Sequence, residues 1–441
     1  MSYLTDRRRF LKSTALTGVG VFVAGTAAAE ESKSPNERLR FACIGVGGKG
    51  ASDSADAKRH GDVVAICDID NDTLEKAGTK GFPKAAKYND FRKLLDEMGK
   101  NIDGVTVSIP DHMHAPVSAM AMRMGKACYT QKPLARTIYE ARRLGEIARE
   151  TAVATQMGNQ GTSFTFLRKT AAAVRAGVIG NVKEVHIWTN RPTWAQGGPR
   201  PPESAVPANV HWDLWLGPAP ERPYAPGYHP HSWRGWWDFG SGALGDMACH
   251  TVNMPFMALD LRDPTAVQAE TSGHNRDSYP KWSVIKYDFP ANADRPGLVM
   301  TWYDGGKTPA PDLFDDVTMS KTGVLLIGDR GKLLAPGDYC ETGHKLFGGA
   351  TEKKADYERS PGHFTELANA IKGGPAPRSN FANYAAPLTE TILLGNLAVW
   401  AAPAADSQGK KIEWDAKNLK PTNAPEVEGL VKPVYRAGYQ L

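Results

Sequence analysis

Long hydrophobic runs and basic tracts are missing from this chain of 441 residues. The apolar stretch from Ala15 to Ala24 is too short and too rich in glycine and threonine to span a bilayer stably, and no other run is long enough. The net charge is only +5, and no basic run interleaves with aromatic residues, so nucleic acid is not an expected partner. The composition, 41% hydrophobic and 23% charged, is typical of a soluble globular protein with two or three domains.

Metal-ligand patterns are missing as well. The five cysteines form no C-x-x-C pair, and most lie in apolar runs, so we expect buried free thiols rather than disulfides: Cys43, Cys67, Cys128, Cys249 and Cys340. Two histidine pairs, His112/His114 and His229/His231, lack a third ligand at zinc-like spacing. We therefore expect no bound metal.

A glycine-rich turn between two predicted strands is the strongest signal in the chain. Phe41–Ile44 and Val63–Cys67 predict buried strands, with an alanine-rich helical segment before the second one. The turn after the first strand reads Gly45, Val46, Gly47, Gly48, Lys49 and Gly50. Its glycines permit a tight turn, a close approach of backbone N–H groups to a pyrophosphate, and close packing of the helix. The order predicts a dinucleotide site, although the glycines alone would also suit a surface loop.

An acidic residue follows the second strand. Asp68 lies 23 residues after Gly45, where a carboxylate bonds the adenosine ribose hydroxyls in such units. It would repel a 2′-phosphate, so NAD is the expected cofactor and NADP is disfavoured.

Two further predicted strands end in polar residues that are expected to face the cofactor. The strand 102–109 ends at Pro110, which forces a turn through His114. The strand Ala127–Thr130 leads to Gln131-Lys132-Pro133. A lysine at the end of a core strand is costly to bury, so Lys132 suits donation to a substrate oxygen; an exposed loop lysine is the alternative.

These motifs together resemble the Gfo/Idh/MocA (glucose–fructose oxidoreductase / inositol dehydrogenase) family, in an exported branch. The resemblance rests on Gly45-x-Gly-x-x-Gly50, Ser108-Ile109-Pro110-Asp111-x-x-His114, Gln131-Lys132-Pro133, 157–161, 215–218, 245–250 and 411–415. It covers nearly all of the chain after the N-terminal segment. Gln131 departs from the usual Glu-Lys-Pro form, so a charge pairing with Lys132 is lost.

The resemblance implies an α/β protein with two domains. Residues 36–160 would form an NAD-binding Rossmann domain with a doubly wound parallel sheet. Residues 161–441 would form a substrate-binding and oligomerisation domain, α/β with a large, mainly antiparallel open sheet and a C-terminal tail. The pattern agrees, because strand–helix alternation ends near residue 156 and several strands follow between 182 and 334. A homodimer or homotetramer through the second sheet is expected.

A predicted helix over 242–253 carries the candidate base. Asp246 and His250 are four residues apart and share one helix face, which suits general base chemistry or, alternatively, a surface ion pair. The resemblance implies that Lys132, Asp246 and His250 converge on a sugar carbon. His250 would take the hydroxyl proton, Lys132 would steady the carbonyl oxygen and Asp246 would position the substrate. Asn253 replaces an aspartate that many family members have.

The resemblance also implies the remaining binding residues. Besides the glycine-rich turn and Asp68, cofactor contacts are expected from Ser108, Pro110, His114, Gln131, Lys132 and Asn159. Substrate contacts are expected from Gln160, Tyr228, His231, Arg234, Trp236, Asp246 and His250.

Tryptophan is concentrated in and beside the segment 189–241, a predicted long loop rich in proline and glycine: Trp188, Trp194, Trp212, Trp215, Trp233, Trp236 and Trp237. Aromatic faces stack on the C–H face of sugar rings, which favours a glycoside pocket. The alternative is that these side chains fill a loop-rich surface or a subunit contact.

The N-terminus resembles a twin-arginine export signal. Asp6-Arg7-Arg8-Arg9-Phe10-Leu11-Lys12 precedes the short apolar stretch, and Ala27-Ala28-Ala29 suits cleavage. Residues 1–35 are thus expected to be a signal peptide and linker, giving a periplasmic protein; an uncleaved anchor or disordered tail is the alternative. Such signals export folded proteins. Since no free NAD pool exists outside the cytoplasm, the cofactor should be tightly held and recycled.

The sequence therefore predicts an exported NAD-dependent oxidoreductase acting on a ring hydroxyl, with C3 of a glycoside as a reasonable position. One alternative is redox-neutral glycoside hydrolysis or lyase chemistry through a transient 3-keto sugar. Another is a non-catalytic sugar-binding protein that retains the nucleotide.

Overall fold

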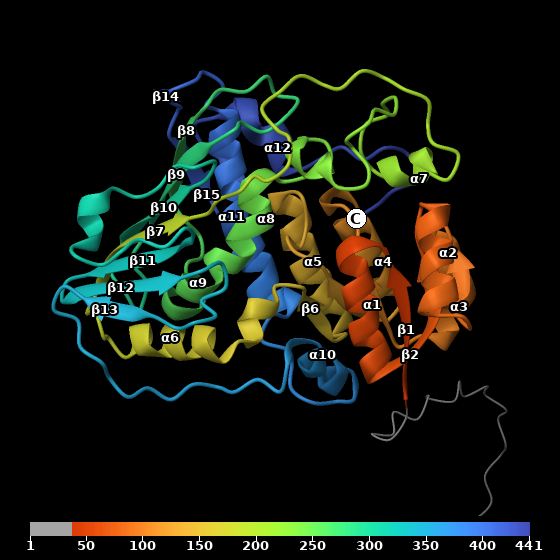
Figure 1. Ribbon diagram of the computed structural model, residues 1–441, viewed down its shortest axis with the longest axis horizontal. Helices are drawn as coiled ribbons and strands as arrows, with labels where there is room; N and C mark the ends of the chain where they lie inside the picture. The colour runs from red at the N-terminus through yellow and green to blue at the C-terminus, as the bar shows by residue number, and fades with distance from the viewer. Residues whose placement is uncertain (1–37) are drawn as a thin grey trace, which may run out of the picture. The chain divides into compact units, whose positions relative to one another are not determined.

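The structure is a computed structural model, and it describes residues 38–441 (Figure 1). Its first sheet has six parallel strands in the order β3-β2-β1-β4-β5-β6. The strands are β1 Leu39–Ile44, β2 Gly61–Cys67, β3 Ala86–Tyr88, β4 Gly104–Val107, β5 Ala127–Thr130 and β6 Thr155–Met157. The order reverses between β1 and β4, and ligands bind beyond the carboxyl ends of strands at such a point.

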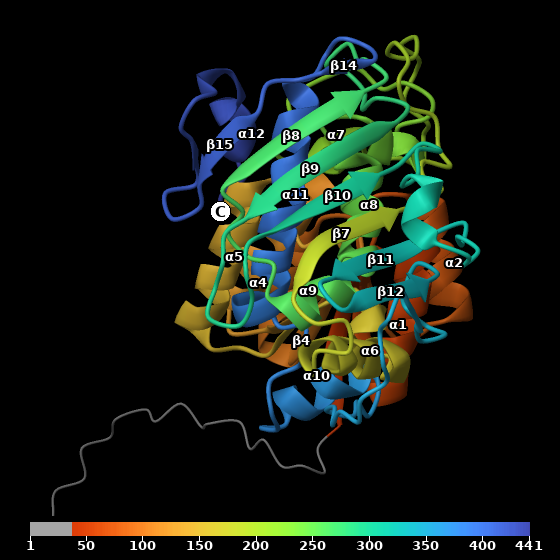
Figure 2. The same cartoon turned by 90° about the vertical axis from the view of Figure 1, so that its left-hand side faces the viewer.

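The second sheet has ten strands and is mostly antiparallel (Figure 2). Its order is β13-β12-β11-β7-β10-β9-β8-β15-β16, with β14 paired to β8, and β7 with β10 is a parallel pair. The strands are β7 Val182–Trp188, β8 Ala266–Thr271, β9 Ser283–Phe289, β10 Leu298–Tyr303, β11 Gly323–Gly328, β12 Gly331–Pro336, β13 Lys345–Phe347, β14 Ser407–Gln408, β15 Ile412–Asp415 and β16 Lys420–Pro421. The predicted fold class, a Rossmann sheet plus a mainly antiparallel sheet, is confirmed.

The helices cover the first sheet and one face of the second. They are α1 Gly48–His60, α2 Asn71–Lys80, α3 Phe91–Met98, α4 Asp111–Arg123, α5 Ile138–Thr151, α6 Thr165–Arg175, α7 Trp212–Leu216, α8 Gly242–Thr251, α9 Asn253–Leu259, α10 His363–Ile371, α11 Ala386–Trp400 and α12 Glu428–Val431. None of the helices within residues 38–441 is both long and apolar enough to cross a membrane.

Helices from the second half of the chain return to the first sheet. In α10, Phe364 packs its ring against Phe41 of β1 and Tyr129 of β5. In α11, Glu390 pairs with Arg142 of α5 at 2.6 Å, while other residues of α11 pack on β8 and β9. Figure 1 shows α11 between the two sheets. The core therefore continues across the predicted boundary near residue 160.

Three local features differ from expectation. The turn expected from Pro110 to His114 is already helical, because extended Pro110 ends the strand and also caps α4, which begins at Asp111. The single helix expected over 242–253 is two helices that meet at Val252. The segment after α11 shows no periodicity in the sequence, but it contributes β14, β15 and β16.

The five cysteines are free and buried, as expected. Burial raises the pKa of each thiol, for example that of Cys43 to about 11. These thiols are therefore core side chains rather than nucleophiles.

Candidate active site

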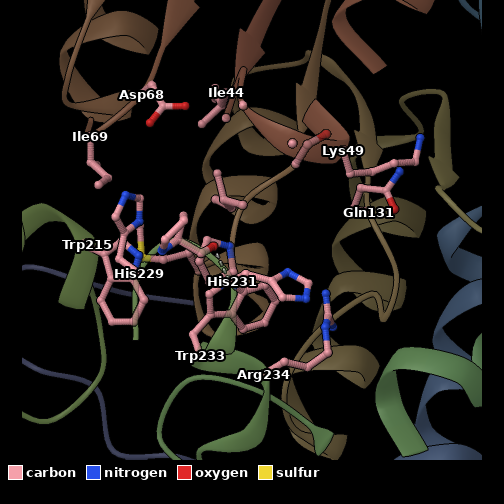
Figure 3. A pocket seen from close by; sticks show the side chains of 18 of the residues that line it. Ile44, Lys49, Asp68, Ile69, Gln131, Trp215, His229, His231, Trp233 and Arg234 are labelled. Carbon is pink, nitrogen blue, oxygen red and sulfur yellow. Dashed lines mark hydrogen bonds between the residues drawn. The ribbon is translucent and has the colours of Figure 1, made fainter. Parts of the chain in front are cut away.

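A cavity of about 750 Å³ lies beyond the carboxyl ends of the first sheet's strands. Its wall comes from the glycine-rich turn, the ends of β2, β4 and β5, the loop 189–241, α8 and the C-terminal tail. Figure 3 shows Asp68 and His229 on one side of this cavity, with Gln131 and Arg234 on the other. The volume suits a dinucleotide with a small substrate.

The glycine-rich turn is built to hold an anion. Gly45 has a φ of +79°, and a Cβ there would lie 2.3 Å from the carbonyl oxygen of Ser108. A Cβ on Gly50 would lie 2.1 Å from the carbonyl oxygen of Gly45. Helix α1 starts after Gly47 with no side-chain cap and no acidic residue in its first turn. Its free N–H groups and dipole therefore face the cavity and fit a pyrophosphate.

Asp68 follows β2 and lines the cavity. Its carboxylate accepts hydrogen bonds from the backbone N–H groups of Val46 at 3.0 Å and Asp70 at 3.1 Å. Burial raises the pKa of Asp68, although these two donors act against that shift. The carboxylate is thus fixed beside the glycine-rich turn, where it fits ribose hydroxyls. The residues present fit NAD, which supplies a hydride acceptor when bound.

Asp53 organises the wall between the glycine-rich turn and Lys132, and sequence reasoning missed it. This fully buried carboxylate of α1 accepts from Ser108 Oγ at 2.8 Å and from Gln131 Nε2 at 2.8 Å. Its other oxygen binds Lys49 Nζ at 2.5 Å. A glutamate at position 131 would face Asp53 as a second anion, which accounts for the amide there.

Lys132 and Asp246 form the charged centre of the site. Lys132 Nζ donates to Asp246 Oδ1 at 2.7 Å and to the Asp246 carbonyl oxygen at 2.8 Å. Arg234 Nε lies 3.3 Å from the same carboxylate oxygen. Burial alone would raise the pKa of Asp246, but Lys132 and Arg234 outweigh it and hold that pKa well below its usual range. Asp246 is therefore an anion that fixes two cations at the cavity wall.

His250 is a buried, neutral imidazole. It is 3% exposed, and its Nδ1 has no hydrogen-bond partner among the described residues. The ring packs edge-on against Tyr339 with centroids 4.7 Å apart. Burial first, and then the charge of Lys132, hold the pKa of His250 well below its usual value. An uncharged ring with a free nitrogen can accept a proton.

Two polar residues near His250 in the sequence have partners other than its ring. Asp246 bonds the cations and makes no hydrogen bond to the ring. Asn253 does not face the cavity, since its side chain donates to Thr162 Oγ1 at 2.8 Å and accepts from the Tyr384 hydroxyl at 2.5 Å.

Most of the predicted site residues line the cavity. They are Gly45, Gly47, Gly48, Lys49, Asp68, Ser108, Pro110, Gln131, Lys132, Gln160, His231, Arg234, Asp246 and His250. The structure does not bring the other five to its wall: Gly50, His114, Asn159, Tyr228 and Trp236.

Those five residues have structural partners instead. Gly50 packs under the turn at Gly45. Both ring nitrogens of His114 lie 2.7 Å from a carbonyl oxygen, one of Pro133 and one of Ile109, so the ring braces the turn that carries Lys132. Asn159 accepts from Ser379 Oγ at 2.5 Å. Tyr228 and Trp236 pack in an aromatic cluster formed by Trp212, Trp215, Tyr228, Trp236 and Phe239.

The tryptophans divide between the cavity wall and the packed interior of the loop region and core. Trp215 and Trp233 line the cavity. The other five fill the loop region or the core: Trp188, Trp194, Trp212, Trp236 and Trp237. Trp237, for example, stacks on Tyr279 with centroids 3.8 Å apart.

Several cavity residues were not predicted: Ile69, Arg191, His229, Tyr339 and Tyr439. The sequence marks His229 as a possible metal ligand, and its Nε2 lies 3.3 Å from Asp70 Oδ2. No group of three metal ligands occurs in the part of the chain from 38 to 441. Tyr339 and Tyr439 stand in segments without a motif, so no sequence signal marks them.

Comparison with known proteins agrees with this geometry. One family model, "Oxidoreductase family, NAD-binding Rossmann fold", matches residues 39–159, and a second, "Oxidoreductase family, C-terminal alpha/beta domain", matches residues 168–299. A glycosyl hydrolase family 109 protein of Solibacter usitatus is 32% identical over 153 residues, which cover 31% of this chain and 34% of that protein. A levoglucosan dehydrogenase of Pseudarthrobacter phenanthrenivorans is 26% identical over 185 residues, covering 42% and 39%.

The chain thus spans 34% and 39% of the length of these two relatives. Solved structures, in contrast, superpose on 85% of the chain. The WlbA dehydrogenase of Bordetella pertussis, solved with NADH and UDP-GlcNAcA, superposes with a TM-score of 0.58 at 16% identity and covers 85% of this chain and 98% of its own. An aldose–aldose oxidoreductase of Caulobacter crescentus, solved with glycerol, also has a TM-score of 0.58, at 17% identity, covering 85% and 100%. These structures share the fold. The chain belongs to the Gfo/Idh/MocA family of NAD-binding oxidoreductases.

Proposed function

We propose that this protein is an exported oxidoreductase that removes hydride from a ring hydroxyl carbon of a sugar or glycoside. One observation carries the proposal: His250, neutral and without a hydrogen-bond partner on Nδ1, shares a cavity with the Lys132–Asp246 pair and the glycine-rich turn. Relatives named levoglucosan dehydrogenase and inositol 2-dehydrogenase support a carbohydrate substrate.

The residues have distinct tasks in this reaction. His250 accepts the hydroxyl proton as the carbon gives up hydride to the bound nicotinamide. Lys132, held by Asp246, donates to the same oxygen and stabilises the charge that develops on it. Each positioned group of this kind is worth roughly 10²–10⁴-fold in rate.

The cavity also supports retention of the cofactor. The loop 189–241 is bonded to the end of β2, because Asn71 N–H donates to the Asn209 carbonyl at 2.8 Å and His211 N–H donates to the Ile69 carbonyl at 3.0 Å. An enclosed cofactor that cannot exchange must return to its starting redox state in each cycle. Two reaction types achieve this. One is oxidoreduction between two sugars. The other is transient oxidation to a 3-keto sugar, elimination of the aglycone and restoration of the hydroxyl, which is net glycoside hydrolysis.

The second type is our other candidate, because several relatives are named glycosyl hydrolase family 109 proteins. Transient oxidation acidifies the neighbouring C–H bond. Turnover in deuterated water therefore places deuterium on that carbon if the protein is a redox-neutral hydrolase. Oxidoreduction between sugars leaves the carbon unlabelled and makes one oxidised and one reduced sugar.

The primary test has two steps. Mass spectrometry of the denatured protein should find stoichiometric NAD, and a panel of sugars and glycosides should then raise the reduced-nicotinamide absorbance. Protein without bound NAD would contradict retention. Bound NAD with no response from any sugar would favour the alternative, a sugar-binding protein that keeps the nucleotide without turnover.

Export is a further part of the proposal and rests on the sequence of the twin-arginine segment, which lies outside the described residues. Replacing Arg7 and Arg8 by lysine should hold precursor in the cytoplasm, while Arg38→Lys, in the described part of the chain, serves as a matched control. Mature periplasmic protein from the Arg7/Arg8 variant would remove the export argument. A homodimer or homotetramer through the second sheet is likewise proposed, and light scattering of the purified protein tests it.

A further inference from the structure

We propose that the C-terminal tail, residues 432–441, forms the outer wall of the adenosine half of the cofactor site, with Tyr439 as its contacting side chain. The inference deepens the proposed retention of NAD and rests on it. It assigns a cofactor-binding role to a segment that lies outside both family-model matches, which cover 39–159 and 168–299.

Tyr439 lines the cavity beside the start of α3. It shares the cavity wall with Asp68, Asp90 and Phe91, which follow β2 and β3. The Arg92 guanidinium lies 5.0 Å from the centroid of the Tyr439 ring. Arg92 is itself paired with Asp90 at 2.8 Å, so the contact places an aromatic face at the wall without leaving an unpaired charge.

The tail is fastened to the loop 189–241 by one arginine. Arg436 Nη1 pairs with Asp213 Oδ1 at 2.6 Å, Nη2 donates to the Asp213 carbonyl at 2.8 Å, and Nε donates to the Gly217 carbonyl at 3.0 Å. Its backbone N–H also donates to the Pro218 carbonyl at 3.0 Å. Asp213 belongs to α7, whose Trp215 lines the cavity. The tail therefore joins α7 to α3 across the outside of the site.

The chemistry of this end suits adenosine rather than phosphate or sugar substrate. Asp68, whose carboxylate is proposed to bind the ribose hydroxyls, lies here. The walls beside it include the rings of Phe91, Trp215 and Tyr439. Flat aromatic walls bury the faces of a nucleobase. The pyrophosphate belongs at the start of α1, and the reacting carbon belongs near Lys132 and His250. Because the tail lies over the adenosine end, release of the cofactor requires the tail to move.

Three single variants test this assignment in the full-length protein. Tyr439→Ala removes the ring from the wall, Arg436→Ala removes the side-chain bonds between the tail and the loop 189–241, and Val434→Ala is the control because Val434 is 92% exposed. We measure NADH release by its fluorescence decay with excess ADP-ribose as trap, and ADP-ribose affinity by calorimetry of cofactor-stripped protein. We expect Tyr439→Ala to weaken NADH and ADP-ribose alike by about tenfold, mostly through faster release. Arg436→Ala should also speed NADH release, and Val434→Ala should match the wild type.

Tyr439→Phe keeps the ring and should bind both ligands as the wild type does, so it separates loss of the wall from loss of folding. Wild-type affinity and release in Tyr439→Ala would overturn the assignment. A loss for NADH without one for ADP-ribose would also overturn it, because the ring would then serve the nicotinamide half. Failure of retention is distinguishable: wild-type protein would purify without NAD, while the ratio of variant to wild-type affinity would still decide the role of the tail.

Discussion

The two ends of the cavity are built in different ways. At the catalytic end, Asp246 and His250 share α8 and Lys132 stands two residues after β5, while only Arg234 among their charged partners comes from the loop 189–241. At the adenosine end, the outer wall consists of the loop 189–241 and the C-terminal tail. The residues proposed to react therefore stand on or beside regular elements, whereas the proposed adenosine wall is built from irregular segments.

The ends also differ in how they treat charge. Asp246 is buried against Lys132 and Arg234, and burying such a cluster costs desolvation energy that its mutual attraction barely offsets. At the other end, backbone N–H groups hold Asp68, and Arg92 is paired with Asp90 beside the aromatic wall. Of the two ends, the catalytic one has the buried charge cluster, so substitutions should separate rate at one end from affinity at the other.

The largest effect is expected at the catalytic end. His250→Ala and Lys132→Ala should each lower the chemical step by roughly 10²–10⁴-fold, because each removes a group that acts on the same proton and hydride transfer. For the same reason the two losses should not multiply fully in the double variant. Single-turnover kinetics measure the step, and bound NAD measured by mass spectrometry should stay near the wild-type amount.

Rescue by pH distinguishes the two roles. Raised pH should partly restore His250→Ala, since hydroxide can replace a base, but it should not restore Lys132→Ala, whose lost function is donation. Near-wild-type nicotinamide reduction by His250→Ala would remove this residue from the mechanism. His231, which also lines the cavity, would then be the next candidate.

The next effect concerns Asp53, which lies between the two ends. Gln131→Glu would set a second carboxylate against this buried group, and we expect it to lower the free energy of unfolding by roughly 2–4 kcal/mol. Adding Asp53→Asn returns one carboxylate and one amide to the pair and should restore much of the loss. Denaturant unfolding of both single variants and the double variant measures the coupling. Additive losses would show that the two side chains do not interact.

The sequence predicts the nucleotide motif and the catalytic residues better than it predicts the irregular segments that complete the cavity wall. The glycine-rich turn, Asp68 and the order of parallel strands follow from local rules, since each needs only a short segment with a fixed period or turn. Lys132 and His250 were found because each stands in a motif at the end of a strand or on a helix face. The structure brings both to one cavity, whereas a direct contact with substrate stays a prediction.

The rest depended on contacts between distant segments. Tyr439 reaches the cavity from a segment whose Arg436 is bound to Asp213, more than two hundred residues earlier. Asp53 is a polar residue inside an alanine-rich helix, and its structural role depends on its contact with Gln131, which follows β5. Tyr228 and Trp236 are expected to contact the substrate, but Trp236 packs edge-on against Tyr228, which packs against Phe239. Periodicity and motif spacing contain no information on such pairs.

A smaller effect is expected for Asp68 at the adenosine end. Asp68→Ala should weaken NAD by about tenfold and NADP by less, because the lost carboxylate binds ribose hydroxyls and repels a 2′-phosphate. Asp72→Ala is the matched control, since Asp72 is exposed in the first turn of α2. Calorimetric titration of both dinucleotides gives the ratio. An equal loss for NAD and NADP would show that Asp68 does not read the ribose.

The smallest effect is a shift in the acid limb of the pH–rate profile, and its sign depends on which neighbour of His250 is removed. Burial and Lys132 lower the pKa of His250 and Asp246 raises it, so the neutral base persists below the usual histidine pKa and kcat/KM should fall only under about pH 6.5. The free energy of unfolding should decline in the same direction, since below that pH the unfolded chain binds a proton that the folded ring resists.

Lys132→Ala removes a cation and should move the acid limb of its residual activity to higher pH. Asp246→Asn removes an anion and should move the limb to lower pH. Profiles of kcat/KM for wild type and both variants measure these shifts, and movement of both limbs in one direction would show that the limb belongs to a group other than His250.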